Sequence, residues 1–198
     1  MLNDLIKDYR IILASQSPRR KLLLEGLDLK FEVIVRKDIP EEFPSGLKMT
    51  QIPVWLARKK SNYYQDLLQD NTLLITADTI VWHNHKLVGK PQDLNDAVKI
   101  LTMLSGSLHE VVTGVCLRSD KMLHSFYSHS RVLFRKLTRE EIGYYVTNYK
   151  PLDKAGAYGI QEWIGYIGIE QIEGSFYNVM GLPVQMLYRE LISFIQSR

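Results

Sequence analysis

Short, nearly continuous apolar runs alternate along this chain with longer segments in which apolar residues recur every three or four positions. The short runs indicate β-strands, and they lie at residues 11–14, 31–35, 73–82, 110–118 and 122–133. Ser119 and Asp120 form a turn signal between the last two runs. These two strands are therefore predicted to form a long hairpin.

The longer segments indicate helices at residues 18–25, 50–68, 94–104, 138–147 and 183–195. Pro18 suits a first helical turn, and Thr138 with Glu141 makes a capping box. Strands alternate with helices early in the chain and follow one another directly later. The pattern therefore predicts an α/β fold, with a mixed, twisted β-sheet flanked by helices.

The composition fits a chain of 198 residues that buries a core of its own, because 45% of the residues are hydrophobic. The 25 basic and 22 acidic residues leave a net charge of +3, which is too balanced for a general nucleic-acid or membrane surface. The first ten residues hold no uninterrupted apolar segment, and the single cysteine, Cys116, has no disulfide partner. We therefore expect a cytoplasmic protein without membrane or nucleic-acid partners.

The segment ASQSPRRK, residues 14–21, places two arginines at the start of a predicted helix. A helix N-terminus carries unpaired backbone N–H groups and a partial positive charge, so further cations there favour a bound phosphate or carboxylate. The alternative is that Ser17 caps the helix while Arg19 and Arg20 point into solvent. These residues alone do not decide between the two interpretations.

The helix predicted over residues 50–68 places a lysine on its apolar face. Four residues form the apolar stripe at about 100° per residue: Ile52, Leu56, Tyr63 and Leu67. Lys60 projects from the middle of that stripe, where it needs a counter-charge or must extend past its neighbours to water. Lys60 is therefore a candidate anion ligand, with extension past Tyr64 as the alternative.

Asp78 interrupts the apolar run LLITADTIVW. A buried aspartate in a strand opposes β propensity and costs free energy without a partner, so it indicates a metal, a lysine or an activated water. A sharp turn at Ala77 is the less favoured alternative. Glu41, Glu42 and Lys90 add charges of both signs in loops. Such a set can bind a polyphosphate, with carboxylates for Mg²⁺ or Mn²⁺ and for activating water.

Several other polar residues carry a less specific signal. His83 and His85 can share one face and bind a metal, but a polar hairpin turn is the favoured interpretation. Asp153 and Lys154 are either groups of the active site, which we favour, or a local ion pair.

Seven segments, in chain order, resemble the Maf family of nucleoside triphosphate pyrophosphatases. They are ILASQSPRRKLLLEGL, LARKKS, TADTIVW, LVGKPQD, LSGSLHEVVTG, PLDKAGAYGIQ and NVMGLP. DKAGAYGIQ is the most discriminating segment, and it is similar to the branch that acts on dTTP and UTP. The resemblance implies one Maf-like domain over residues 1–198, with two lobes around a nucleotide cleft as in inosine triphosphatase-like folds. It also implies hydrolysis between the α and β phosphates, to a monophosphate and pyrophosphate, with a divalent cation.

The resemblance also implies roles by motif position. Asp78 would accept a proton, and Glu41 would help to place metal or water, so these two are the implied metal ligands. Lys60 and Lys90 join them as catalytic residues that contact phosphates. The implied substrate-binding residues are Ser15, Arg19, Arg20, Thr79 and Gln161. Among them, Gln161 can satisfy a pyrimidine edge by paired donor and acceptor contacts.

Four positions depart from the family pattern: Pro40, Thr76, Lys150 and Glu162. Pro40 precedes Glu41 where the family often has an acid, and Glu162 replaces a glycine beside Gln161, which leaves the base preference open. The resemblance further implies an enzyme that removes unwanted or modified nucleotides, and it is consistent with a homodimer. A nucleotide-sensing regulatory protein linked to cell division, without turnover, is the alternative function.

Overall fold

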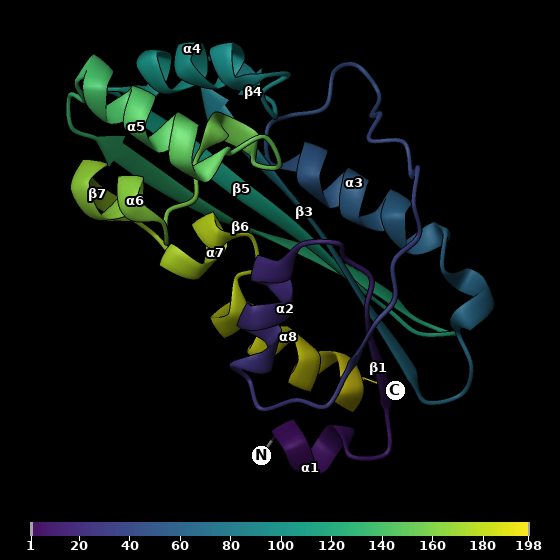
Figure 1. The fold of residues 1–198 in the computed structure, drawn as a ribbon. Helices are drawn as coiled ribbons and strands as arrows, with labels where there is room; N and C mark the ends of the chain where they lie inside the picture. Colours follow the sequence, from purple (N-terminus) through teal and green to yellow (C-terminus); the bar gives the residue numbers. More distant parts are fainter. Residues whose placement is uncertain (1, 198) are drawn as a thin grey trace. The chain divides into compact units, whose positions relative to one another are not determined.

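The structure is a computed structural model that describes residues 2–197. Seven strands form one sheet in the order β2-β1-β3-β5-β6-β7, with β4 paired to β3 (Figure 1). The strands are β1 Arg10–Leu13, β2 Glu32–Val33, β3 Thr72–His83, β4 Lys86–Val88, β5 Leu108–Arg118, β6 Leu123–Phe134 and β7 Ile169–Glu173. β1 pairs in parallel with β2 and β3, whereas β4 and β7 pair antiparallel with their neighbours. The predicted mixed sheet is therefore confirmed.

The helices account for the segments with three- and four-residue periodicity. They are α1 Leu2–Ile6, α2 Pro18–Glu25, α3 Gln51–Asn62, α4 Leu94–Leu104, α5 Arg139–Tyr149, α6 Trp163–Gly168, α7 Phe176–Met180 and α8 Val184–Gln196, with short 3₁₀ turns η1 Gln65–Leu67 and η2 Ala155–Ala157. The bounds of α2 and α4 are those predicted. Five elements were not predicted: α1, β4, α6, β7 and α7. All five are short, so periodicity has few residues on which to act.

The chain divides into two compact units. The first comprises Met1–Asp78, Thr113–Ser128 and Gly181–Arg198, and the second comprises Thr79–Val112 and His129–Met180. Three long strands, β3, β5 and β6, each contribute residues to both units. The single Maf-like domain expected over residues 1–198, and its nucleotide cleft, stay predictions.

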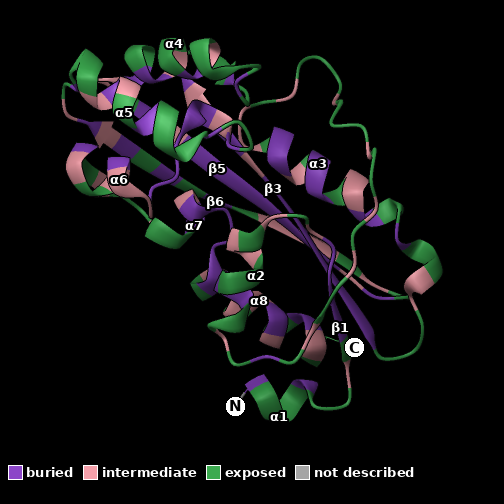
Figure 2. Ribbon diagram, in the orientation of Figure 1, coloured by how far each residue is buried: buried purple, intermediate pink, exposed green. Residues whose placement is uncertain are grey.

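The core of the first unit is built on β1 and the beginning of β3. Both segments are buried along nearly their whole length, and Figure 2 shows β3 in the colour of buried residues. Parallel strands covered on both faces carry continuous apolar residues, which explains why neither segment alternates in sequence. Ile12, Tyr64 and Leu74 form one buried cluster of this unit. Helix α1 packs against α8 near the two ends of the described chain.

Helix α3 is shorter than the sequence predicts. It ends at Asn62, and a separate 3₁₀ turn follows at Gln65–Leu67, so the prediction of one helix over residues 50–68 was wrong. Tyr63 was placed on the apolar stripe but is 41% exposed, whereas Tyr64 is buried in the core cluster. Tyr64 buries its ring against Ile12 and Leu74, and this burial outweighs the preference for continued helix. The chain therefore leaves the helix before Tyr64.

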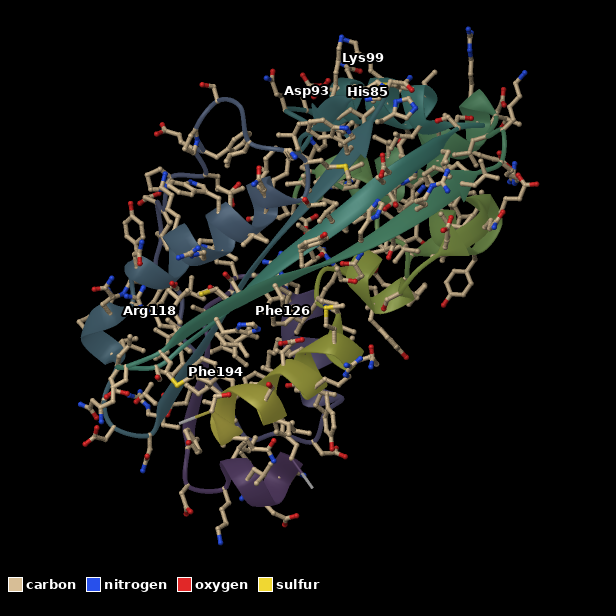
Figure 3. All side chains as sticks on the ribbon, turned by 180° about the vertical axis from the view of Figure 1, so that it is seen from behind. His85, Asp93, Lys99, Arg118, Phe126 and Phe194 are labelled. Carbon is tan, nitrogen blue, oxygen red and sulfur yellow. The ribbon has the colours of Figure 1, made fainter. Side chains whose placement is uncertain are left out.

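The second unit contains the hairpin β3–β4 and helices α4 to α7. Val81, Val88, Val111 and Val132 form its buried cluster, and α4 packs against α5. Side chains cap both helices: Asp93, labelled in Figure 3, accepts the N–H of Asp96, and Thr138 makes the predicted capping box with Glu141.

The turn between β3 and β4 contains Asn84 and His85, both with positive φ, and His83 pairs with Lys86 across it. The favoured interpretation of the two histidines as a hairpin turn is therefore confirmed. The predicted hairpin of β5 and β6 is also present. These strands are neighbours in the sheet, and the N–H of Ser119 donates to the carbonyl of Met122 in their turn.

Candidate active site

The loop between β1 and α2 is held by its own serines and by Arg20. Ser17 caps α2 by accepting the N–H of Arg20, at 3.4 Å, while the Ser15 hydroxyl accepts the N–H of Ser17, at 3.2 Å. The Arg20 guanidinium donates to the carbonyl of Gly181 through Nε, at 2.8 Å, and approaches Ser15 Oγ to 3.5 Å. The capping alternative is thus correct for Ser17. Its second half is wrong for Arg20, which is partly buried and turned toward the protein.

Lys60 lies between two carboxylates of the first unit. It projects from the last turn of α3, and its ammonium donates to Glu41 Oε1, at 2.9 Å, and to Asp78 Oδ1 in a shorter ion pair. The side chains of Lys60 and Asp78 are only 16% and 10% exposed, whereas that of Glu41 is half exposed. The predicted counter-charge for Lys60 is therefore present, and Asp78 lies within strand β3, so no turn interrupts the strand at Ala77.

Charge and burial act in opposite directions on Asp78. Burial raises the pKa of this carboxyl above its usual range, while Lys60 and Arg20 favour its ionised form and reduce the shift. Burial lowers the pKa of the Arg20 guanidinium, and Asp78 partly offsets that effect. A carboxylate with a raised pKa beside two cations is a suitable proton acceptor near neutral pH.

Two close contacts fix α3, and thus Lys60, against the strands. The hydroxyl of Thr76, on β3, donates to the carbonyl of Ala57 on α3, at 2.7 Å. Gly114, on β5, faces the backbone of the same helix, and a Cβ at this position would lie 2.3 Å from the carbonyl carbon of Pro53. Thr76, one of the departures from the family pattern, therefore joins the strand that carries Asp78 to the helix that carries Lys60.

Three of the remaining predicted site residues belong to the second unit, and Arg19 belongs to the first. Thr79 follows Asp78 along β3 and is partly buried, and Lys90 is exposed in the loop after β4. Gln161 is partly buried in the turn before α6, and its Oε1 atom is buried without a hydrogen-bond partner among residues 2–197. The side chain of Arg19, in the first unit, is partly buried on α2.

The second unit also contains a buried polar cluster that sequence patterns did not reveal. Tyr145, on α5, donates its hydroxyl to Glu162 and accepts the N–H of Gly159, at 3.0 Å. Glu162 also pairs with Lys154, at 3.2 Å. His109 Nε2 lies 2.7 Å from the hydroxyl of Tyr158. The sequence marks Glu162 only by its position beside Gln161, and no local pattern connects it to Tyr145.

Lys154 and Asp153 form the local ion pair of the alternative interpretation, at 2.7 Å, but Lys154 also reaches Glu162 and is 8% exposed. The backbone around them is linked to the loop that bears Lys90, because the N–H of Gly156 donates to the carbonyl of Gly89, at 3.1 Å. The segments GKPQD and DKAGAYGIQ are therefore held together within this unit.

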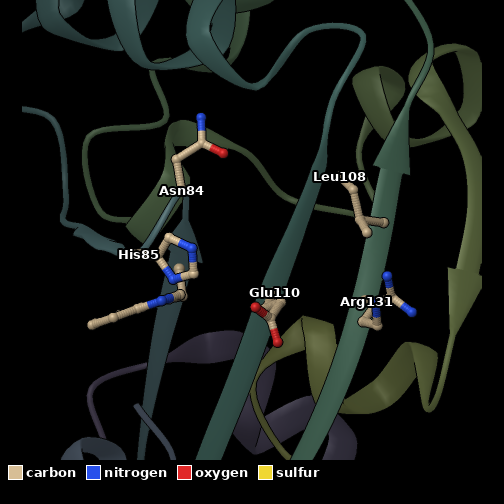
Figure 4. Close-up of a pocket in the computed structure, with 6 residues that line it drawn as sticks. Asn84, His85, Leu108, Glu110 and Arg131 are labelled. Carbon is tan, nitrogen blue, oxygen red and sulfur yellow. The ribbon is translucent and has the colours of Figure 1, made fainter. Parts of the chain in front are cut away.

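A separate pocket of about 380 Å³ opens on the second unit and contains none of the predicted site residues (Figure 4). Its lining residues are Trp82, Asn84, His85, Leu108, Glu110 and Arg131. Two of its charges are already paired, because Glu110 binds His129 and Arg131 binds Glu173, at 2.7 and 2.9 Å. The predicted chemistry does not lie in this pocket.

The metal-binding capacity of the candidate site depends on two carboxylates. No group of three or more His, Cys, Asp or Glu residues suited to a metal ion occurs within residues 2–197. Glu41 and Asp78 nevertheless converge on one ammonium group, which places two carboxylates close to the same point. Hard oxygen donors of this kind suit Mg²⁺ or Mn²⁺.

No helix among residues 2–197 is long and apolar enough to cross a membrane.

Comparison with known proteins shows that the similarity covers nearly the whole chain, beyond the seven resembling segments. A family model described as "Maf-like protein" matches residues 10–194. A dTTP/UTP pyrophosphatase of Porphyromonas gingivalis (strain ATCC BAA-308 / W83) is 53% identical over 196 residues, which cover 98% of each chain. A dTTP/UTP pyrophosphatase of Parabacteroides distasonis is 54% identical over 194 residues, which cover 98% of this chain and all of that one.

Among solved structures, that of the Staphylococcus aureus Ham1 protein has a TM-score of 0.49 and 16% identity, over 93% of this chain and 98% of that one. That likeness is too weak to support a statement about activity. The family match, by contrast, spans residues 10–194, and the two relatives are 53% and 54% identical over nearly the whole sequence. The chain belongs to the Maf family.

Proposed function

We propose that this protein is a nucleoside triphosphate pyrophosphatase that hydrolyses dTTP and UTP between the α and β phosphates. Water is added at this anhydride, and the products are the nucleoside monophosphate and pyrophosphate. Relatives that are 53% and 54% identical over nearly the full length carry the name dTTP/UTP pyrophosphatase. The observation that carries the proposal is the ammonium of Lys60 held by both Asp78 and Glu41.

In the proposed mechanism, Asp78 accepts the proton of the attacking water. Burial raises its pKa, so the carboxylate is more basic than an exposed aspartate, while Lys60 and Arg20 favour its ionised form. Lys60 orients this carboxylate and offsets phosphate charge. Arg20 supplies a second cation beside the capped N-terminus of α2, where anions are favoured.

The two carboxylates fit a divalent cation as well as a lysine. We propose that Glu41 and Asp78 hold Mg²⁺ or Mn²⁺, since both offer hard oxygen donors that converge on one point. When bound, such an ion neutralises phosphate charge and lowers the pKa of bound water. Ser15 and Arg19 belong to the proposed substrate-binding set. The roles of Thr79, Lys90 and Gln161 as nucleotide ligands stay predictions.

Product analysis tests the activity. Purified protein with Mg²⁺ or Mn²⁺ is incubated with dTTP, UTP, other triphosphates and base-modified pyrimidine triphosphates in ¹⁸O-labelled water, and the products are separated by mass spectrometry. We expect monophosphate and pyrophosphate, with the label in the monophosphate, because attack occurs at the α phosphorus. Label in the pyrophosphate would move the attack to the β phosphorus, and release of orthophosphate would refute the proposed reaction.

Asp78→Asn tests the proton acceptor. We expect this variant to lose about 10²-fold or more in turnover, the usual contribution of general base catalysis, while keeping its circular dichroism spectrum. Asp66→Asn is the matched control, because Asp66 is an exposed aspartate of the same unit that pairs with Arg36. Equal activity of the wild type and Asp78→Asn would remove Asp78 from the mechanism.

A nucleotide sensor without turnover is the competing function. The same cations bind phosphate, but a buried carboxylate beside the phosphates repels them unless a cation intervenes. Binding of UTP without any product, in the presence of either metal, would support the sensor and refute the enzyme.

We further propose that the protein works in the cytoplasm, where it removes unwanted or modified pyrimidine nucleotides, and that it forms a homodimer. A preference for modified triphosphates over dTTP in the product assay would support the first role. Light scattering after size-exclusion chromatography gives the oligomeric state, and a mass of 23.0 kDa would refute the dimer.

A further inference from the structure

Gln161 lies in a tight turn whose two ends are both held by one side chain. The turn runs from Gly159 to Glu162 and is closed by the N–H of Glu162, which donates to the carbonyl of Gly159 at 3.0 Å. The hydroxyl of Tyr145 accepts the N–H of Gly159 and donates to the carboxylate of Glu162. A single buried hydroxyl therefore joins the first and last residues of the turn.

The carboxylate of Glu162 has a second partner, which is a cation. Lys154 is 8% exposed and reaches Glu162 at 3.2 Å, so the charge of Glu162 is matched within the unit. Glu162 also packs on the turn itself, because a Cβ at Gly159 would lie 2.7 Å from the carboxyl carbon of Glu162. Burial and the neighbouring carboxylate raise the pKa of Tyr145, so its hydroxyl stays protonated and able to donate.

Gln161, which this turn carries, has a buried acceptor atom without a hydrogen-bond partner among the described residues. This atom is Oε1, and burying a polar atom without a partner is costly. Uracil and thymine present an N3–H donor to such an acceptor, whereas cytosine presents a lone pair at N3. A turn held in place keeps Oε1 where it favours uracil and thymine, whereas a turn that shifts allows Nε2 to serve cytosine.

We propose that Glu162 and Tyr145 are positioning residues for base selection, which fix the turn that carries Gln161 and thereby favour UTP and dTTP over CTP. The inference rests on the proposed function, because it takes Gln161 to contact the base of the substrate. It goes beyond that function by giving a role to Glu162 and Tyr145, two residues that the proposed mechanism does not use.

The test compares UTP with CTP in two variants. Tyr145→Phe removes the hydroxyl that joins the ends of the turn, and Glu162→Gln removes the charge that binds Lys154. For both, we expect the ratio of kcat/KM for UTP to that for CTP to fall about fivefold, the value of one neutral hydrogen bond. The change is expected in KM, with kcat for UTP retained, because the reacting groups are untouched. The double variant is expected to lose less than the product of the two single losses, since both act on one clamp.

Two control variants keep the comparison specific. Tyr149→Phe removes a hydroxyl from the ring that stacks on Tyr145, and Glu173→Gln neutralises an exposed carboxylate paired with Arg131. Neither is expected to change the UTP to CTP ratio. A general loosening of the unit would lower kcat/KM for both nucleotides equally and leave the ratio unchanged, and that result would overturn the inference.

Binding keeps the test independent of turnover. The affinity of each variant for α,β-methylene UTP and α,β-methylene CTP is measured by calorimetry, and the same fivefold loss of preference is expected. A wild type that binds UTP preferentially but hydrolyses nothing refutes the proposed function alone. A wild type that hydrolyses UTP, with an unchanged base preference in both variants, refutes only the positioning role. A wild type that binds and hydrolyses UTP and CTP equally well has no base preference to be positioned, and this result also refutes the inference.

Discussion

Acidification is expected to destabilise this protein through one buried histidine, His109. Burial lowers its pKa from 6.5 to about 3; the residue is 1% exposed, and its ring packs beside Phe134 and Tyr158. Nδ1 has no hydrogen-bond partner within the described residues, so a second ring proton finds no acceptor there. Protonation therefore favours the unfolded state.

The magnitude follows from linkage. A histidine whose folded pKa is depressed contributes stability that is complete above the unfolded pKa and is lost as the pH falls from 6.5 toward 3. For these two pKa values, His109 alone removes about 2 kcal/mol from the free energy of unfolding between pH 7.5 and pH 5, and about 5 kcal/mol below pH 3.

Urea unfolding at pH 7.5 and pH 5 measures this loss. His109→Gln removes the titrating group and keeps a hydrogen-bonding side chain beside Tyr158, so its decrease in stability between the two pH values is expected to be about 2 kcal/mol smaller than that of the wild type. His85→Gln, at an exposed histidine of the second unit, is expected to follow the wild type. Identical pH dependence of His109→Gln and the wild type would refute the argument.

Three further predictions concern the packing of α3, the charge of Lys60 and the cap of α5. Gly114→Ala forces a Cβ into the backbone of α3, so we expect the free energy of unfolding in urea to fall by about 1–3 kcal/mol and hydrolysis to be reduced. Gly143→Ala is the control, because its Cβ would enter open space on α5, and we expect it to stabilise the protein. Lys60→Met removes a charge that lowers the pKa of Asp78, so the acid limb of the pH–rate profile is expected to move to higher pH; an unmoved limb would contradict the pairing. Thr138→Ala removes the capping box and is expected to lower the melting temperature at a cost of about 1 kcal/mol, and no change would show that the cap is dispensable.

Helix bounds were predictable where local signals mark them. The helix that begins at Pro18 has the predicted bounds because Ser17 caps it and proline suits its first turn. The helix over Leu94–Leu104 has them because its cap and its periodicity agree. Short elements such as β7 and α7 were missed because they form against other elements of the second unit. The helix before Tyr63 was overestimated, because the burial of Tyr64 outweighs helical periodicity.

The candidate site was predictable in part for a chemical reason. A charged residue in an apolar pattern needs a partner wherever the chain folds, and both Asp78 and Lys60 break such a pattern. The sequence could therefore indicate that each has a counter-charge, but their separation by 18 positions hides that they are each other's partner. The orientation of Arg20 toward Gly181 was likewise undecidable, because its acceptor is 161 positions away.

The sequence by itself determined the alternation of strands and helices, the charged residues placed within apolar segments, and the motifs that mark a member of the Maf family. Those features depend on neighbours within a few positions, where propensity, capping and spacing act. Only the tertiary structure decided that Lys60 joins Asp78 to Glu41 and that Tyr145 holds both ends of the turn bearing Gln161. Hydrogen bonds between distant segments form only where packing brings donors and acceptors together, and no local pattern encodes that proximity.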